Sequence, residues 1–140
     1  MIAHCVLPNY NLKLFKLVGA VEVKEVLAFI KGRAAAGDRE VMPSLWVDLR
    51  EVATVMSYEE VSQIIAGLQL SEVVNREHRV GFLVASKAVF GVCRMFGMLL
   101  TSRLEVEVQV FLSIEAGEKW LGVPLRELLA ELPPERWETA

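Results

Sequence analysis

Short apolar segments of strand length alternate along this chain with longer segments in which apolar residues recur every three or four positions. The strand-like segments cover residues 2–7, 12–18, 44–50, 80–85 and 106–110. The helix-like segments begin near residues 23, 57, 87 and 115. Strands that alternate with helices favour a mainly parallel sheet with right-handed crossovers. The order ββαβαβαβα therefore predicts an α/β domain whose five-stranded, mixed but mostly parallel sheet is flanked by helices.

Three of these strands also carry information about their place in the sheet. Residues 8–11 form a short turn-rich connection, which predicts that the first two strands are antiparallel. The continuous apolar run at 80–85 is typical of an interior parallel strand. At 106–110, valines alternate with Glu107 and Gln109, which predicts an edge strand. We expect one domain over residues 1–122, followed by a short helix and a frayed tail over 123–140.

The predicted helix from Lys87 to Ser102 has almost no polar side. Arg94 is the only charged residue between Lys87 and Arg103. A helix that covers a sheet needs one apolar stripe and one wet face, so we expect this helix to be covered by more than its own sheet. Three covers are open: a second copy of the chain, a lipid-like molecule, or the segment 125–132 of the same chain.

Composition limits the class of protein. The chain has 140 residues, 54% of them hydrophobic, and a net charge of −3. No apolar run approaches the roughly 20 residues that span a bilayer, and the first ten residues do not have the pattern of a secretory signal. We therefore expect a cytoplasmic protein without integral membrane contact. Its basic residues are dispersed, which argues against nucleic acid as a partner.

The sequence lacks the patterns of common catalytic and metal sites. It has no glycine-rich phosphate loop and no nucleophile elbow. His4 and His78 have no neighbours at metal-ligand spacing, and Cys5 and Cys93 are most simply reduced core thiols. We therefore expect no enzymatic activity, no metal and no cofactor.

Three motifs suggest a family. VDLREV lies on the third strand, VFGVCRMF on the apolar helix, and VQVFLSIEAGEKWLG ends near residue 122. Together they resemble the SpoIIAA-like family, small bacterial proteins of the STAS type whose fold is also similar to that of CRAL–TRIO lipid-transfer proteins. The resemblance covers about residues 2–122. It implies a STAS-like fold more than an activity, because fold does not fix function.

The resemblance also draws attention to Ser57. In sporulation regulators of this superfamily, an Asp-Ser-Ser-Gly segment begins the helix after the third strand, and phosphorylation of a serine there switches binding to an anti-sigma factor. Ser57 falls at that position, but the acidic residue and the glycine are absent. Ser57 and Glu60 also form a capping-box pattern. Regulation by phosphorylation and a plain N-cap role are both open.

A candidate ligand site follows from the sheet topology, because open parallel sheets bind ligands beyond the carboxyl ends of their strands. The candidate residues are Asp48, Arg50, Ser86, Lys87, Phe90 and Arg94. The first two end the third strand, and the others begin the apolar helix, whose N-terminus attracts anions. An anionic head group with an apolar tail would suit them. In the alternative interpretation each is structural, with Ser86 as an N-cap and Asp48 paired to Arg50.

The sequence thus predicts a non-catalytic binding or regulatory module of the STAS type, acting through its apolar helix as a small oligomer, most simply a homodimer. Two alternatives stay open. One is a carrier or sensor of a lipid-like amphipathic anion, and the other is a phosphorylation-controlled partner switch at Ser57.

Overall fold

The computed structural model describes residues 1–36, 43–74 and 78–139. The strands are β1 (Ile2–Leu7), β2 (Leu12–Gly19), β3 (Ser44–Val52), β4 (Arg79–Leu83), β5 (Glu107–Phe111) and β6 (Glu138–Thr139). The α-helices are α1 (Val23–Ala35), α2 (Tyr58–Ser71), α3 (Lys87–Leu104), α4 (Ile114–Leu121) and α5 (Leu125–Glu131). Two short 3₁₀ turns, η1 (Pro8–Tyr10) and η2 (Pro134–Arg136), complete the elements of the described residues. Every element that the hydrophobic pattern predicts is present.

The strands form one sheet in the order β5-β4-β3-β2-β1-β6. β1 and β2 are antiparallel, whereas β2, β3, β4 and β5 are parallel neighbours. This topology confirms the antiparallel opening pair, the interior position of β4 and the edge position of β5. The predicted count of five strands is low by one, because Glu138 and Thr139 in the tail pair with β1 as β6. Two residues are too few to produce an alternating pattern.

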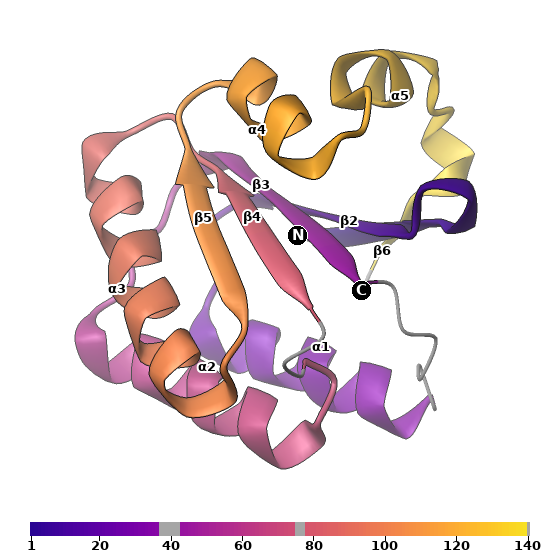
Figure 1. Cartoon of the computed structure of the whole chain (residues 1–140). Helices are drawn as coiled ribbons and strands as arrows, with labels where there is room; N and C mark the ends of the chain where they lie inside the picture. The colour runs from indigo at the N-terminus through magenta and orange to yellow at the C-terminus, as the bar shows by residue number, and fades with distance from the viewer. Residues whose placement is uncertain (37–42, 75–77, 140) are drawn as a thin grey trace.

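The helices form two layers on opposite faces of the sheet (Figure 1). Helices α1, α2 and α3 lie on one face, and α4 and α5 lie on the other. A right-handed crossover through a helix places that helix on one particular face, so three successive β-α-β units put α1, α2 and α3 side by side. α4 and α5 follow the last parallel strand and are free to cross to the opposite face.

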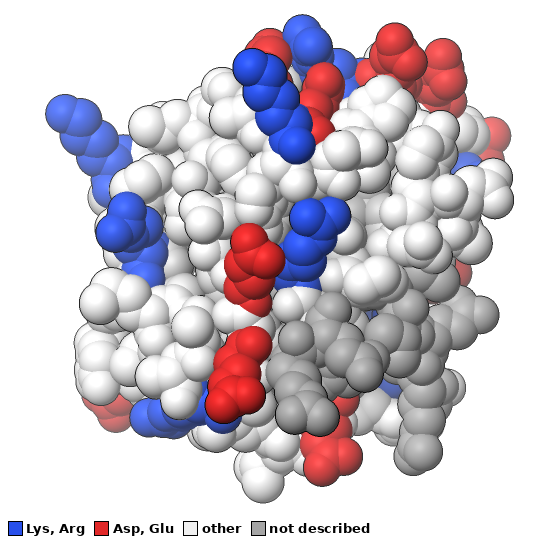
Figure 2. All heavy atoms as spheres, in the orientation of Figure 1, with Lys and Arg blue, Asp and Glu red and all other residues white. Residues whose placement is uncertain are grey.

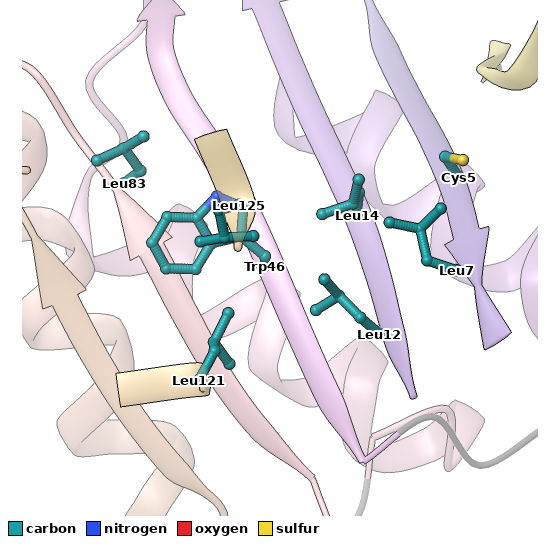
Figure 3. Packing of buried hydrophobic residues seen from close by; sticks show 8 residues of the cluster. All are labelled: Cys5, Leu7, Leu12, Leu14, Trp46, Leu83, Leu121 and Leu125. Atoms are coloured by element: carbon teal, nitrogen blue, oxygen red, sulfur yellow. The ribbon is translucent and has the colours of Figure 1, made fainter. Parts of the chain in front are cut away.

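The face under α4 and α5 is tightly packed around Trp46 (Figure 3). Trp46 is 1% exposed and Leu125 is completely buried, and both belong to one apolar cluster with Leu83 and Leu121. Gly117 of α4 makes room for the indole ring, because a Cβ atom at this position would clash with Cη2 of Trp46. α5 and the residues after it are therefore part of the folded core on this face.

The apolar helix α3 is covered by the chain itself. Leu100 is 1% exposed and packs in a cluster with residues of α1 and α2, while Cys93 packs against β4. Gly97 approaches Val108 of β5 so closely that an added Cβ atom would lie 2.9 Å from Val108 Cγ1. The missing polar side of this helix therefore reflects contact with both the sheet and α2. The segment 125–132 lies on the opposite face of the sheet and does not cover α3.

Candidate ligand cavity

The two faces of the sheet are packed to different degrees. On the face under α4 and α5, Leu12 and Leu14 of β2 and Trp46 of β3 are at most 1% exposed. On the opposite face, the alternate residues Phe15 of β2 and Val47 of β3 are only half-buried, although these strands lie inside the sheet and helices cover them. Half-buried apolar residues beneath a helical layer indicate a space between the layers.

That space is an apolar cavity of about 250 Å³ between the sheet and helices α1, α2 and α3. Its floor is formed by the alternate residues of β2 and β3, namely Phe15, Leu17, Leu45, Val47 and Leu49. Its helical wall includes Val26, Phe29, Ile64, Val92, Cys93 and Phe96. The cavity therefore lies under the apolar helix that the sequence singled out, but on the side that faces the interior.

The polar residues of the cavity wall lie near its two ends. Lys13, Arg33 and His78 line the end at which β3 and β4 begin, and Thr54 lines the end at which β3 finishes. The described residues of the lining include no aspartate or glutamate. Among the described residues of the lining, formal charge is therefore positive and lies at one end.

Arg33 is the best-defined polar group of this lining. It lies in the last turn of α1, and its NH1 atom is 3.2 Å from Nε2 of His4. Its guanidinium also lies over the ring of Phe29, 5.9 Å from the centroid. Glu138 of β6 reaches the same imidazole, with Oε2 3.1 Å from Nε2. No carboxylate among the described residues contacts Arg33 itself.

The opposite end of the cavity reaches the surface. The hydroxyl of Thr54 accepts a hydrogen bond from the Val21 amide at 3.1 Å, which joins the segment before α1 to the segment after β3. The next residue, Val55, lines the cavity and yet is 54% exposed. A residue that meets both the cavity and the solvent marks an opening.

Asp48 and Arg50, the first two candidate residues from the sequence, lie together but outside this cavity. Asp48 has the same parity on β3 as Trp46, so its side chain lies on the face of α4 and α5. Its carboxylate accepts hydrogen bonds from Nε and NH2 of Arg50 at 3.1 and 2.8 Å. This hydrogen bond raises the pKa of the Arg50 guanidinium.

The other four candidates lie along α3. Ser86 is its N-cap, accepting a hydrogen bond from the Val89 amide at 3.2 Å, and Lys87 beside it is exposed. Phe90 packs against the cluster between α3 and the sheet, and Arg94 is exposed. These residues do not line the cavity. The ends of β3 and β4 are neighbours, as expected, but Asp48 and α3 lie on opposite faces of the sheet.

Ser57 forms the capping box that the sequence predicts. Its hydroxyl accepts from the Glu60 amide at 3.2 Å, and its own amide donates to Oε1 of Glu60 at 3.0 Å. The hydroxyl is at the surface between two exposed apolar residues, Val55 at 54% and Tyr58 at 60%.

Both cysteines are buried, free thiols. Burial raises the pKa of the Cys93 thiol, which lines the cavity, to about 12. Burial also raises the pKa of Cys5, against the opposing influence of Arg136. Among the described residues no cluster of histidine, cysteine and carboxylate side chains could hold a metal ion, and no described helix could cross a membrane.

Sequence reasoning missed the cationic end of the cavity. Lys13 and Arg33 are ordinary charged residues in the sequence, 20 positions apart. A signal was nevertheless present: Lys13 occupies an alternate position of β2 that should face the helices, and Arg33 lies one turn after Phe29 and Ile30, which face the sheet. Helix and strand periodicity together place both residues toward the interior.

The charged residues on the face drawn in Figure 2 do not form a field of one sign. Figure 2 shows Lys and Arg side chains interspersed with Asp and Glu side chains over the drawn face. A polyanion would meet no continuous basic surface there.

Comparison with known proteins establishes the fold. No family model and no curated protein matches the chain. A solved structure of an uncharacterised protein of the DUF3478 family with a SpoIIAA-like fold, from Shewanella loihica PV-4, matches with a TM-score of 0.50 and 15% identity over 78% of this chain and 82% of that chain. The anti-sigma factor antagonist SpoIIAA in its unphosphorylated form matches with a TM-score of 0.50 and 12% identity over 86% of this chain and 97% of that chain. The chain thus has the SpoIIAA-like α/β fold that its motifs resemble.

Proposed function

We propose that this protein is a non-catalytic binding module that takes an apolar or amphipathic small molecule into the cavity beneath α1, α2 and α3. The cavity is the single observation that carries the proposal. Soluble domains are packed about as densely as organic crystals, with few voids larger than a water molecule. A space of about 250 Å³ with an almost wholly apolar wall is therefore an exception, and a bound apolar molecule would fill it.

The size and shape of the cavity favour a linear chain over a compact ring. Its volume exceeds the ~150 Å³ of an engineered apolar cavity that binds benzene and is just below the range of roughly 300–1,000 Å³ for drug-sized ligands. Lining residues on β3 run from Leu45 to Val52, a length of roughly 23 Å at ~3.3 Å per residue. A long, narrow apolar space suits an alkyl or acyl chain.

The chemistry of the wall supports binding more than catalysis. The thiolate is the nucleophilic form of cysteine, and with its pKa near 12 the Cys93 side chain is held as a neutral thiol. The lining also lacks a paired acid and base of the carboxylate type among its described residues. Sequestration of a ligand from water is what such a wall does well.

Dodecan-1-ol tests this proposal, because it offers an alkyl chain without a charge. We expect saturating dodecan-1-ol to raise the melting temperature of the protein, since a ligand that binds only the folded state stabilises it. Val47→Phe places a larger side chain on the cavity floor and should abolish the shift. No shift in the unchanged protein, together with no complex in native mass spectrometry, would rule out the proposed ligand class.

A second candidate is a partner switch at Ser57. The observation that favours it is the pair of exposed apolar side chains, Val55 and Tyr58, on either side of an exposed serine hydroxyl. Exposed apolar side chains are available to a protein partner, and a phosphate at a helix N-terminus is electrostatically favourable. SpoIIAA, which shares the fold, is an anti-sigma factor antagonist whose structure was described in its unphosphorylated form.

Three variants test this second candidate in a pull-down with a candidate partner. Ser57→Asp should change partner capture relative to Ser57→Ala, because only the first adds charge at the helix N-terminus. Ser113→Ala is the control, since Ser113 caps α4 in the same way but away from Val55. Equal capture by the unchanged protein and all three variants would remove the switch.

A homodimer through α3 is a separate proposal. The surface of α3 that is available for it is smaller than the sequence suggested. The exposed strip of α3 includes Ala88, Gly91, Arg94 and Met98, the last of which is 70% exposed. The interior accounts for the other apolar residues. Light scattering at micromolar concentration distinguishes a dimer from a monomer, and Met98→Glu should dissociate a dimer that uses this strip.

A further inference from the structure

The cavity has one charged end, and that end identifies the kind of molecule it holds. We infer that the ligand is an anionic amphiphile, a carboxylate on an extended alkyl chain, whose head group is bound by Arg33. This inference rests on the proposed function and adds the chemistry and the direction of the ligand. It places the head group at the end where β3 begins, away from Lys87 and Arg94.

The first argument is the state of Arg33. A guanidinium presents five N–H donors and is charged at every physiological pH. Arg33 is half-buried, and among the described residues its contacts are the His4 imidazole and the Phe29 ring, neither of which carries a formal negative charge as a carboxylate does. Buried charges are normally paired, and this guanidinium is partly withdrawn from water. A ligand carboxylate supplies the missing anion.

The second argument is the arrangement of charge along the wall. Lys13 and His78 line the same end as Arg33, because Lys13 pairs with Leu45 in the first rows of the sheet and His78 directly precedes β4. The far end offers Thr54, whose hydroxyl already accepts the Val21 amide. One end therefore complements an anion, and the remaining length complements an apolar chain.

The third argument is the way in which Arg33 is held. His4 is 7% exposed, stacks against Phe15 and meets Phe29 edge to face, and both phenylalanines line the cavity. Its Nε2 atom lies between NH1 of Arg33 and Oε2 of Glu138. The aromatic packing fixes the position of the imidazole, so the guanidinium is oriented before the ligand arrives. Preorganisation of this kind reduces the entropic cost of binding.

The experiment compares two ligands that differ only in their head group, dodecanoate and dodecan-1-ol, by calorimetric titration at pH 8. Arg33→Met removes the guanidinium and keeps an apolar side chain. We expect it to weaken dodecanoate binding about 10- to 100-fold, the usual effect of losing a charge-assisted hydrogen bond, and to change dodecan-1-ol binding less than about threefold. Arg33→Lys, which keeps the charge, should retain part of the preference for dodecanoate.

Arg94→Met is the matched control. It makes the same change in net charge on the exposed side of α3, outside the cavity, and should leave the binding of both ligands unaltered. If Arg33→Met and the unchanged protein bind dodecanoate equally well, the head-group assignment is overturned. Binding of dodecan-1-ol in the same experiment would still support the cavity as the ligand site. Loss of dodecanoate binding in Arg94→Met alone would also overturn it and place the head group near the start of α3. Failure of the unchanged protein to bind either molecule would overturn the proposed function itself.

Discussion

Arg79 shows how much a single polar residue contributes to this fold. It begins β4, and its NH1 and NH2 atoms donate to the carbonyl oxygens of Trp120 and Leu121, both at 3.1 Å. Its Nε and NH2 atoms also lie 3.3 Å from the Ser44 hydroxyl, and the guanidinium covers the Trp120 ring at 5.2 Å. The carbonyls of the last helical turn have no partner within their own helix. Arg79 therefore satisfies the end of α4 and attaches that helix to the sheet.

Replacing Arg79 should be costly for this reason. We expect Arg79→Met to lower the free energy of unfolding by about 2–3 kcal/mol, because two partly buried carbonyls lose a charged donor. Arg79→Lys should recover only part of the loss, since a single ammonium cannot reproduce the planar fork of donors. Equilibrium unfolding in urea measures both. Arg103→Met, an exposed change in the last turn of α3, is the control, and an equal effect from it would contradict the proposed attachment.

The thiol of Cys93 should be almost inert in the folded protein. With a pKa of about 12, only about one molecule in ten thousand carries the reactive thiolate at pH 8. In the Cys5→Ala variant, which isolates this thiol, we expect labelling by iodoacetamide at pH 8 to be slow in buffer and rapid in urea. Rapid labelling of the folded protein would contradict the burial of Cys93.

The raised pKa of Cys93 also affects the stability of the protein at high pH. The pKa of Cys93 is raised above its ordinary value of 9.0, so the folded state retains its proton at pH values where the unfolded state has lost it. The contribution to stability is complete below about pH 9 and is lost as the pH rises toward about 12. Cys93→Ala should flatten this part of the pH profile.

At the scale of elements, α3 carries two glycines with opposite roles. A Cβ atom at Gly97 would lie 2.9 Å from Val108 Cγ1, whereas one at Gly91 would meet nothing within 4 Å. We expect Gly97→Ala to lower the free energy of unfolding by about 1–3 kcal/mol through overpacking. Gly91→Ala should raise it by about 0.5–1 kcal/mol, because alanine favours the helix. Thermal and urea unfolding of the pair measures the difference, and the same sign for both variants would contradict the close contact of α3 with β5.

The sequence predicted elements well because their periodicity is a local property. Strand β5 at the edge and β4 in the interior followed from alternating and continuous apolar patterns, and the Ser57 capping box followed from two residues three positions apart. β6 was missed because its two residues obtain their strand conformation only from pairing with β1. Local patterns do not encode such a distant partner.

The candidate site was harder to predict for a related reason. Topology placed Asp48 and Arg50 near the carboxyl ends of the parallel strands, and their pairing was foreseen as an alternative. However, a side chain can contribute to a ligand site only on its own face of the sheet. Asp48 lies on the face opposite α3, so it cannot share a site with the candidate residues of that helix. Arg33 is a candidate ligand-binding residue only because α1 places it in the wall of a cavity that several elements form together. A space between layers is the result of packing, and sequence spacing does not reveal it.

At the scale of the whole molecule, the two faces of one sheet are packed to different degrees, and the proposed binding uses only one of them. The face under α4 and α5 is closed around Trp46, with glycine at position 117 to admit the ring. The face under α1, α2 and α3 leaves about 250 Å³ unfilled. An unfilled cavity lowers stability, by roughly 24 cal/mol per Å³ in measured cavity-forming variants. Under the proposed function, a fold that retains such a space trades stability for the capacity to bind.

This division predicts that stability and binding change in opposite directions at Val47. Val47→Phe extends a side chain from the cavity floor into the empty space, so we expect the ligand-free protein to gain about 1 kcal/mol in free energy of unfolding, even as dodecan-1-ol binding is lost. Val110→Phe is the matched control, because Val110 packs between β5 and α3 outside the cavity, and overpacking there should cost about 1–3 kcal/mol. Urea unfolding of both variants without ligand decides the matter: if Val47→Phe destabilises the protein as Val110→Phe does, the space beneath α1, α2 and α3 is closed in solution and the basis for ligand binding is gone.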